Sequence, residues 1–125
     1  MANPICWFEI YVDDMPRAKE FYQTLMNVEL SLLSDPTNTS MEMWAFPSDM
    51  GQYGASGTLV KMQGISAGGN STIIYFSSSD CAIEATRIEQ AGGQIHQAKM
   101  SIGPHGFIVL GIDTEGNIFG IHSMQ

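Results

Sequence analysis

The chain has 125 residues, of which 44% are hydrophobic and 14% charged, and its 13 Asp and Glu outnumber its 5 Lys and Arg. This length and composition predict a single folded domain over residues 1–125 and argue against disorder. An acidic surface repels phosphate groups, and no segment has the roughly 20 apolar residues of a membrane span, so neither nucleic acid nor a membrane is an expected partner. The first four residues lack the basic and hydrophobic stretches of a secretory signal, which predicts a cytoplasmic location.

The first predicted strand, residues 7–12, has two different faces. Its even-numbered residues are apolar and suit packing beneath a helix, whereas Trp7, Glu9 and Tyr11 share the opposite face and suit a cavity wall. A helix follows, with Asp14 as its cap, Pro16 in its first turn and Asn27 as its left-handed end. Its apolar stripe falls at i, i+3, i+4 and i+7 and consists of Ala18, Phe21, Tyr22 and Leu25.

Three shorter strands are expected next, over residues 28–33, 41–46 and 57–62, and a Gly-rich linker over 63–70. The same order then recurs. A strand over residues 72–78 leads to a helix that Asp80 caps and that ends at Ala91, before Gly92 and Gly93. The last three predicted strands cover residues 94–98, 106–112 and 117–122. Gly116 and Asn117, in the hairpin turn 113–117, suit a positive φ.

The chain therefore contains a repeat, with one copy over about residues 4–63 and the other over about 71–123. It predicts an α+β fold of two βαβββ units, in which a cupped mixed sheet carries the helices on its outer face. Cys6 and Cys81 occupy matching places in the two copies, and we expect two buried, inert thiols rather than a disulfide.

These landmarks resemble the vicinal oxygen chelate superfamily, which includes glyoxalase I, bleomycin resistance proteins and extradiol dioxygenases. The similarity rests on the opening 8–15, the helix segment 18–22, the second helix ending at 91–93, and the turn Asp-Thr-Glu-Gly-Asn at 113–117. It covers essentially the whole sequence. Members commonly form homodimers, some with cavities completed across the subunit boundary, so the resemblance implies a homodimer here.

The resemblance also assigns positions to a divalent metal, and this chain departs from the pattern at each of them. The ligand positions in the first and last strands fall on Trp7, Ile73 and Gly120, and the fourth-strand position falls near Leu59 and Lys61. Trp, Ile and Gly side chains offer no suitable lone pair to a metal ion. No metal and no cofactor are therefore expected at the usual site.

Glu9, Tyr75 and His122 are each two residues from an empty ligand position, so they point to the same side and could hold a displaced metal. The simpler interpretation pairs Glu9 with a cation such as Lys61 or Lys99. Between Trp7 and Tyr11, on a face expected to be semi-buried, the Glu9 carboxylate would also be desolvated, which would make it a better general base. Its role as a catalytic base, as a ligand contact and as a structural carboxylate all stay open.

Two functions follow from these patterns. The first is a small-molecule-binding protein of the glyoxalase and bleomycin resistance type, without the usual metal, which binds its ligand in an aromatic-lined cup. The second is a glyoxalase-like lyase or isomerase that uses Glu9 as its catalytic base, with a displaced metal or none. The predicted ligand-binding residues are Trp7, Glu9, Tyr11, Trp44, Lys61, Ile73, Tyr75 and His122.

Overall fold

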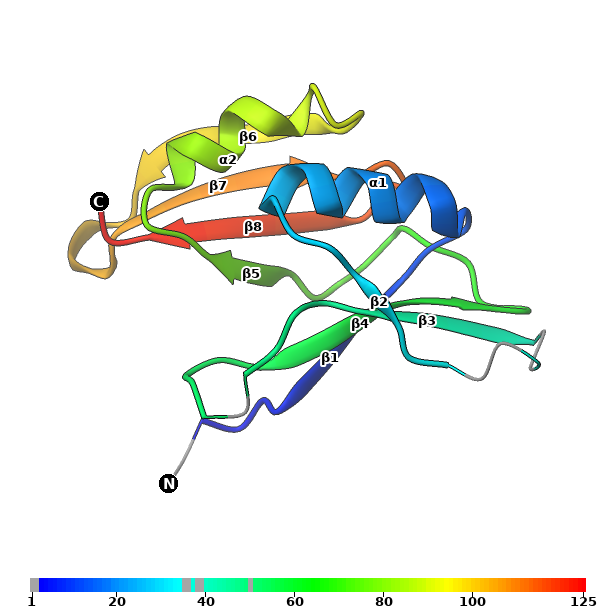
Figure 1. Ribbon diagram of the computed structural model, residues 1–125. Helices are drawn as coiled ribbons and strands as arrows, with labels where there is room; N and C mark the ends of the chain where they lie inside the picture. The colour runs from blue at the N-terminus through cyan, green and yellow to red at the C-terminus, as the bar shows by residue number, and fades with distance from the viewer. Residues whose placement is uncertain (1–2, 35–36, 38–39, 50) are drawn as a thin grey trace.

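The secondary structure of the computed structural model, which describes residues 3–34, 37, 40–49 and 51–125, follows the order of two βαβββ repeats (Figure 1). The first repeat consists of β1 (Trp7–Tyr11), α1 (Met15–Met26), β2 (Ser31–Leu32), β3 (Met41–Ala45) and β4 (Ser56–Met62). The second consists of β5 (Ile74–Ser77), α2 (Cys81–Ile88), β6 (Gln94–Ser101), β7 (Phe107–Ile112) and β8 (Ile118–Ser123), with a 3₁₀ turn at Gly103–His105. The predicted α+β fold with two repeats is confirmed.

Each repeat forms its own four-stranded mixed sheet. The strand order is β1-β4-β3-β2 in the first sheet and β5-β8-β7-β6 in the second, so β1 and β5 occupy equivalent edges. β1 runs parallel to β4, and β5 runs parallel to β8. The other pairings in both sheets are antiparallel. The eight strands described are therefore two hydrogen-bonded sheets rather than one continuous cup.

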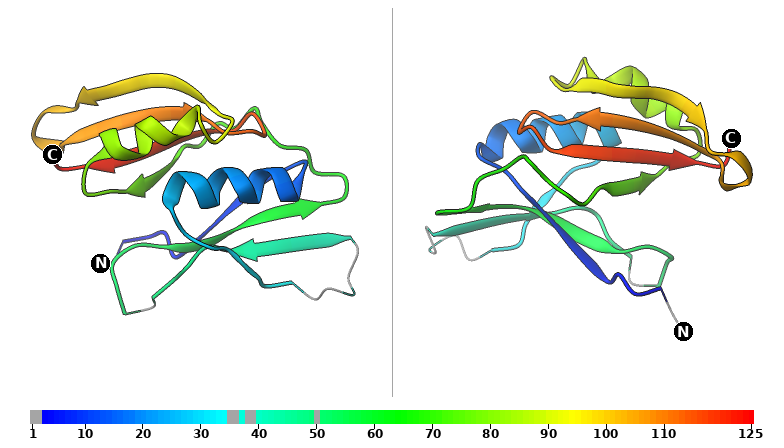
Figure 2. Two further views of the ribbon diagram at one scale, coloured as in Figure 1. Left: turned by 45° about the horizontal axis from the view of Figure 1, so that its top comes forward. Right: turned by 180° about the vertical axis from the view of Figure 1, so that it is seen from behind.

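The two sheets turn their helix-bearing sides toward a shared core. Figures 1 and 2 show α1 between the sheets and α2 against the second sheet. The ring of Phe8 in β1 lies 6.0 Å from that of Phe76 in β5, and Phe21 of α1 lies 5.7 Å from Phe119 of β8. Tyr22 also contacts rings from both sheets. Because side chains alternate along a strand, the opposite faces of both sheets point away from this core.

The helix ends follow the sequence prediction closely. Asp14 accepts a hydrogen bond from the Arg17 amide, and Asp80 accepts one from the Ala82 amide. Asn27 closes α1 with φ 54°. α2 ends at Ile88, three residues before the predicted end, and the following turn reaches Gly92 at φ 103°.

Three local predictions were wrong or incomplete. β2 has only two residues because the chain before it serves the core instead, with Leu30 buried and its amide bonded to the Gln23 side chain. β6 is longer than predicted, since it pairs with β7 as far as Ser101 through two register shifts. In the 113–117 turn, Gly116 has the expected positive φ but Asn117 does not.

The predicted burial of both thiols was half right. Cys81 is fully buried at the start of α2, but Cys6 is exposed because it precedes β1 and lies outside the sheet. Neither cysteine is in a disulfide. Among the described residues, no helix has both the length and the apolar character to cross a membrane. The cytoplasmic location stays a prediction.

Candidate binding face

The outward face of β1 carries three side chains that hydrogen-bond to one another. Trp7 Nε1 donates to Glu9 Oε2 at 3.3 Å, and the Tyr11 hydroxyl donates to Glu9 Oε1 at 2.9 Å. The bond to Glu9, together with partial burial and the nearby negative charge, raises the pKa of the Tyr11 phenol. The sequence correctly placed these three residues together. We call Trp7, Glu9 and Tyr11 the β1 face.

Glu9 differs from its prediction in two respects. It is exposed, whereas the sequence predicted a semi-buried position for it. Its hydrogen-bond partners are also the two aromatic residues rather than a lysine. Lys99 instead binds Asp80 at 2.8 Å, and Lys61 lies on the other side of its strand, opposite Glu42 in the ladder.

A second set of predicted residues lies on the outward side of the other sheet. Tyr75 and His122 share this side because Tyr75 is paired with Gly120 and Ser77 with His122. Tyr75 is 47% exposed, and a Cβ built on Gly120 would lie 2.3 Å from its ring, so the ring covers the glycine. His122 Nε2 is 2.7 Å from the His105 carbonyl oxygen. We call Ile73, Tyr75 and His122 the β5 face.

The structure does not bring the β1 and β5 faces together within one chain. They belong to different sheets, and both point away from the shared core. Trp44 also lies away from the β1 face, because it is paired with Leu59 and packs against the core. The ammonium of Lys19 lies 3.2 Å from the centre of the Trp44 ring.

The residues present do not fit the metal ion that the resemblance implies. Leu59 is fully buried on the helix side, next to Ile10, so the outward positions of β4 are Ser56, Thr58, Val60 and Met62 instead. In the part of the chain that the structure describes, no three His, Cys, Asp or Glu side chains are close enough to hold a metal. Glu9 is on the first sheet and His122 on the second. Within one chain, these side chains therefore give no support to a step that requires a bound metal.

A cavity of about 180 Å³ lies where the two repeats meet. Of the predicted site residues, it contains only Glu9 and Tyr11. The linker, β5 and β8 supply most of the remaining wall, and its lining residues are Ile10, Tyr22, Ser66, Ala67, Gly68, Asn70, Thr72, Ile74, Asn117, Ile118 and Phe119. The loop 64–70 is expected from the sequence to shape the mouth of the cup, although it carries no motif that would name the ligand, and four of its residues line this cavity.

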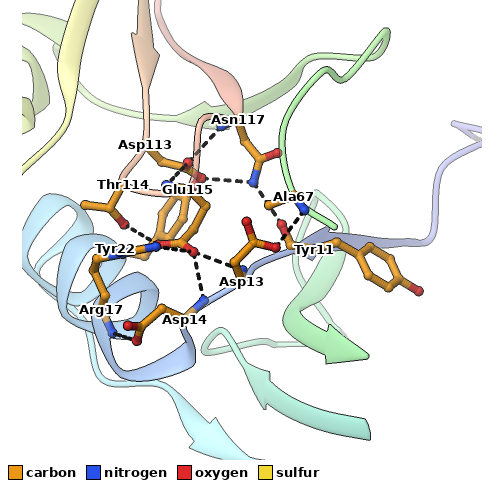
Figure 3. Close-up of polar contacts among 10 residues, drawn as sticks. All are labelled: Tyr11, Asp13, Asp14, Arg17, Tyr22, Ala67, Asp113, Thr114, Glu115 and Asn117. Atoms are coloured by element: carbon orange, nitrogen blue, oxygen red, sulfur yellow. Dashed lines mark hydrogen bonds and ion pairs between the residues drawn. The ribbon is translucent and has the colours of Figure 1, made fainter. Parts of the chain in front are cut away.

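The 113–117 turn, which carries the resemblance, joins the second repeat to the first (Figure 3). The Glu115 carboxylate accepts hydrogen bonds from the amides of Asp13 and Asp14, both at 2.9 Å. It also binds the Arg17 guanidinium, with the shorter contact at 2.7 Å, and the Thr114 hydroxyl. Burial alone would raise the pKa of Glu115, but these bonds outweigh it and lower the pKa to about 2.

Two neighbours of Glu115 in the same turn extend these contacts inward (Figure 3). The Tyr22 hydroxyl donates to Asp113 at 2.6 Å, and desolvation raises the pKa of both groups. The Asn117 side chain donates to the Tyr11 carbonyl and accepts from the Gly68 amide. The turn therefore fixes the end of β1 and the linker, and both contribute to the cavity wall.

Comparisons with known proteins agree with this fold. A family model described as the Glyoxalase/Bleomycin resistance protein/Dioxygenase superfamily matches residues 5–119. No curated protein matches the chain significantly. A solved mutant of glyoxalase I from Zea mays is 18% identical with a TM-score of 0.76, over 96% of this chain and 46% of the maize chain. This chain thus spans about half the length of that protein.

Two solved structures from Streptomyces sp. CB03234 match over nearly their whole length. TnmS3, an antibiotic-binding protein, is 21% identical with a TM-score of 0.70, and the match covers 100% of this chain and 99% of that one. A glyoxalase/bleomycin resistance protein is 21% identical with a TM-score of 0.67, over 94% and 98%. At these identities the structures establish the fold alone. With the family model covering nearly the whole sequence, the chain belongs to the glyoxalase/bleomycin resistance protein/dioxygenase superfamily.

Proposed function

We propose that this protein binds a flat, aromatic small molecule against the β1 face, without a metal. The observation that supports this most is the hydrogen-bonded set on β1, where two aromatic side chains hold a carboxylate between them. Trp7 is 41% exposed beside Glu9 and Tyr11, so its ring is accessible to a ligand. Aromatic residues around a few placed polar groups are typical of ligand sites. The antibiotic-binding relative makes such a role plausible for this fold.

The dimensions and charge of the site restrict the class of ligand that it can bind. The cavity, at about 180 Å³, is smaller than the roughly 300–1,000 Å³ of most ligand pockets. A larger ligand would therefore lie over the open β1 face and reach the cavity with one end. Glu9 accepts hydrogen bonds, and the chain carries a net charge of −8, so a neutral or cationic ligand is favoured over an anion.

We further propose that two chains complete the site as a homodimer. Each chain has one β1 face and one β5 face, and these point apart. Each includes side chains of an edge strand, β1 or β5, and exposes apolar surface, with Trp7 at 41%, Ile73 at 37% and Tyr75 at 47%. A twofold axis would place the β1 face of one chain against the β5 face of the other and form two equivalent cups. The predicted residues Trp7, Glu9, Tyr75 and His122 would then meet.

Ligand binding can be tested with tryptophan fluorescence, because the chain has only two tryptophans and they lie on opposite faces. In Trp44→Phe, Trp7 alone reports on the β1 face. A thermal-shift screen of flat aromatic amines, alcohols and acids should identify a stabilising compound that also quenches Trp7. Glu9→Gln should weaken the binding of this compound. Glu89→Gln, an exposed control in the second repeat, should leave its binding unchanged. Binding that survives both Glu9→Gln and Trp7→Ala would exclude the β1 face.

The same variants separate binding from catalysis. Turnover of hemithioacetal substrates that is lost in Glu9→Gln would favour the alternative, a glyoxalase-like lyase or isomerase with Glu9 as base. Binding without turnover, with or without added divalent metals, is the result expected here.

The shared site can be tested by mixing two defective variants. Trp7→Ala damages only the β1 face and Tyr75→Ala only the β5 face. If each cup uses both chains, mixed dimers regain one intact cup, so an equal mixture recovers about a quarter of the binding sites. If each site lies within one chain, mixing recovers none. The mass in solution, by sedimentation, should be that of two chains.

A further inference from the structure

The outward side of the first sheet contains a polar group with no internal partner. Thr58, in β4, is fully buried, yet its hydroxyl oxygen has no hydrogen-bond partner, the only such buried side-chain atom among the described residues. An unpaired buried hydroxyl costs on the order of 1–3 kcal/mol, so native structures retain few of them. Such a group is therefore a candidate for contact with something that binds.

The strand register places Thr58 directly beside Glu9. The two residues are ladder partners in the parallel pair β1–β4, so their side chains leave the same face about 4.8 Å apart. On its other side Thr58 is paired with Ala45, which offers only a methyl group. Glu9 is thus the nearest polar side chain across the ladder, and its oxygens bind Trp7 and Tyr11 instead.

Thr58 is fully buried and is not among the residues that line the cavity, so a ligand group reaches its hydroxyl only if a neighbouring side chain moves. The bond from Trp7 to Glu9 is 3.3 Å long, beyond the usual 2.7–3.2 Å, whereas the bond from Tyr11 is 2.9 Å. Because Trp7 is also 41% exposed, we take its side chain to be the one that moves when a ligand binds. A ligand group that replaces the Trp7 bond would bind Glu9 Oε2 next to the Thr58 hydroxyl.

We propose that Thr58 and Glu9 form a paired contact for a protonated amine on an aromatic ligand, an inference that rests on the proposed function. An ammonium group has three donors, which can satisfy one carboxylate oxygen and the Thr58 oxygen together. Glu9 supplies the charge, and Thr58 supplies the neutral acceptor beneath it. The hydroxyl is unsatisfied in the free protein and satisfied in the complex, so it contributes to specificity at a cost in stability.

The experiment uses 1-naphthylmethylamine as probe, with 1-naphthaleneacetate as the anionic control, in wild type, Thr58→Val, Thr58→Ser and Glu9→Gln. Valine keeps the shape of threonine and suits a strand, so Thr58→Val should fold. Removal of an unpaired hydroxyl should raise the Tm of the free protein by about 3–15 °C. The same change should lower the affinity for the amine about tenfold, as measured by calorimetry, whereas Thr58→Ser should retain most of that affinity.

The outcomes separate the two proposals. A lower Tm for free Thr58→Val would show that the hydroxyl has a partner within the protein, and unchanged amine affinity would show that the ligand does not use it. Either result overturns the Thr58 proposal while Glu9-dependent binding still supports the proposed function. If wild type binds neither probe, or binds the acid as well as the amine, the role of the β1 face fails and the Thr58 proposal fails with it.

Discussion

Glu115 shows how one carboxylate can connect two halves of a chain. Its side chain is fully buried, and all its donors except the Thr114 hydroxyl come from residues about 100 positions earlier, at the end of β1 and the start of α1. Arg17, by contrast, is half exposed, so solvent screens its part of the interaction. The two backbone amides depend on the position of the carboxylate and would be left unpaired without it.

Glu115 should therefore make the protein sensitive to acid. Its pKa in the folded state is about 2, against an ordinary value of 4.5. Its contribution is complete above about pH 4.5 and is lost as the pH falls toward 2, and it amounts to about 2–3 kcal/mol after screening. Glu115→Gln should lower the free energy of unfolding at pH 7 by about this amount. It should also make that free energy depend less steeply on pH below pH 4.5. Urea titrations from pH 2.5 to 7 measure both, with Glu89→Gln as the control. If the stability of Glu115→Gln falls below pH 4.5 as steeply as that of the wild type, Glu115 is not the source of the acid sensitivity.

At the scale of the elements, β5 and β8 show why the last-strand ligand position is glycine here. The Tyr75 ring lies directly over Gly120, and a methyl group at that position would overlap the ring. Gly120 therefore supports the exposed aromatic side chain of the β5 face. The absence of a metal ligand at this position and the presence of the aromatic residue are linked by packing.

A double-mutant cycle tests this contact. Gly120→Ala should cost about 1–3 kcal/mol because the Tyr75 ring must move. In the Tyr75→Ala background the same change should cost nothing or stabilise, since alanine suits a strand better than glycine. Guanidinium unfolding of the four proteins gives the coupling energy. Equal costs in the two backgrounds would mean that the ring does not rest on Gly120.

The elements themselves were largely predictable, and their placement was not. Helix ends at Asp14, Asn27 and Asp80 depend on local chemistry, so the sequence locates them well. The alternation along β1 likewise gave the correct face for Trp7, Glu9 and Tyr11. Trp44 and Lys61 were harder, because the face of a residue in β3 or β4 depends on the register with neighbouring strands, which no local pattern specifies.

At the scale of the whole molecule, the two repeats depend on each other for their core. Phe119 of the second repeat contacts Phe21 and Tyr22 of α1, and Phe76 contacts Phe8 and Phe46. The relative position of the sheets follows from these long-range contacts. The sequence predicted one cup because the repeat reveals the units but not how they pack, and for the same reason the burial of Thr58 was missed.

This shared core should make unfolding cooperative across both repeats. Both tryptophans lie in the first repeat, so their fluorescence reports on it alone. Phe119→Ala, in the second repeat, should cost about 3–5 kcal/mol and shift the fluorescence and circular dichroism transitions equally. Ile83→Ala, at an exposed position on α2, should change little. Transitions that separate in Phe119→Ala would show that the repeats fold independently.

The unequal burial of the two cysteines has a practical consequence. A maleimide dye should react at position 6 and leave the buried thiol in α2 unmodified, so the native sequence accepts one label next to Trp7. Such a label would report ligand arrival without any substitution. The same accessibility allows air oxidation to cross-link two chains, so only a mass measured under reducing conditions can be attributed to association through the sheet faces.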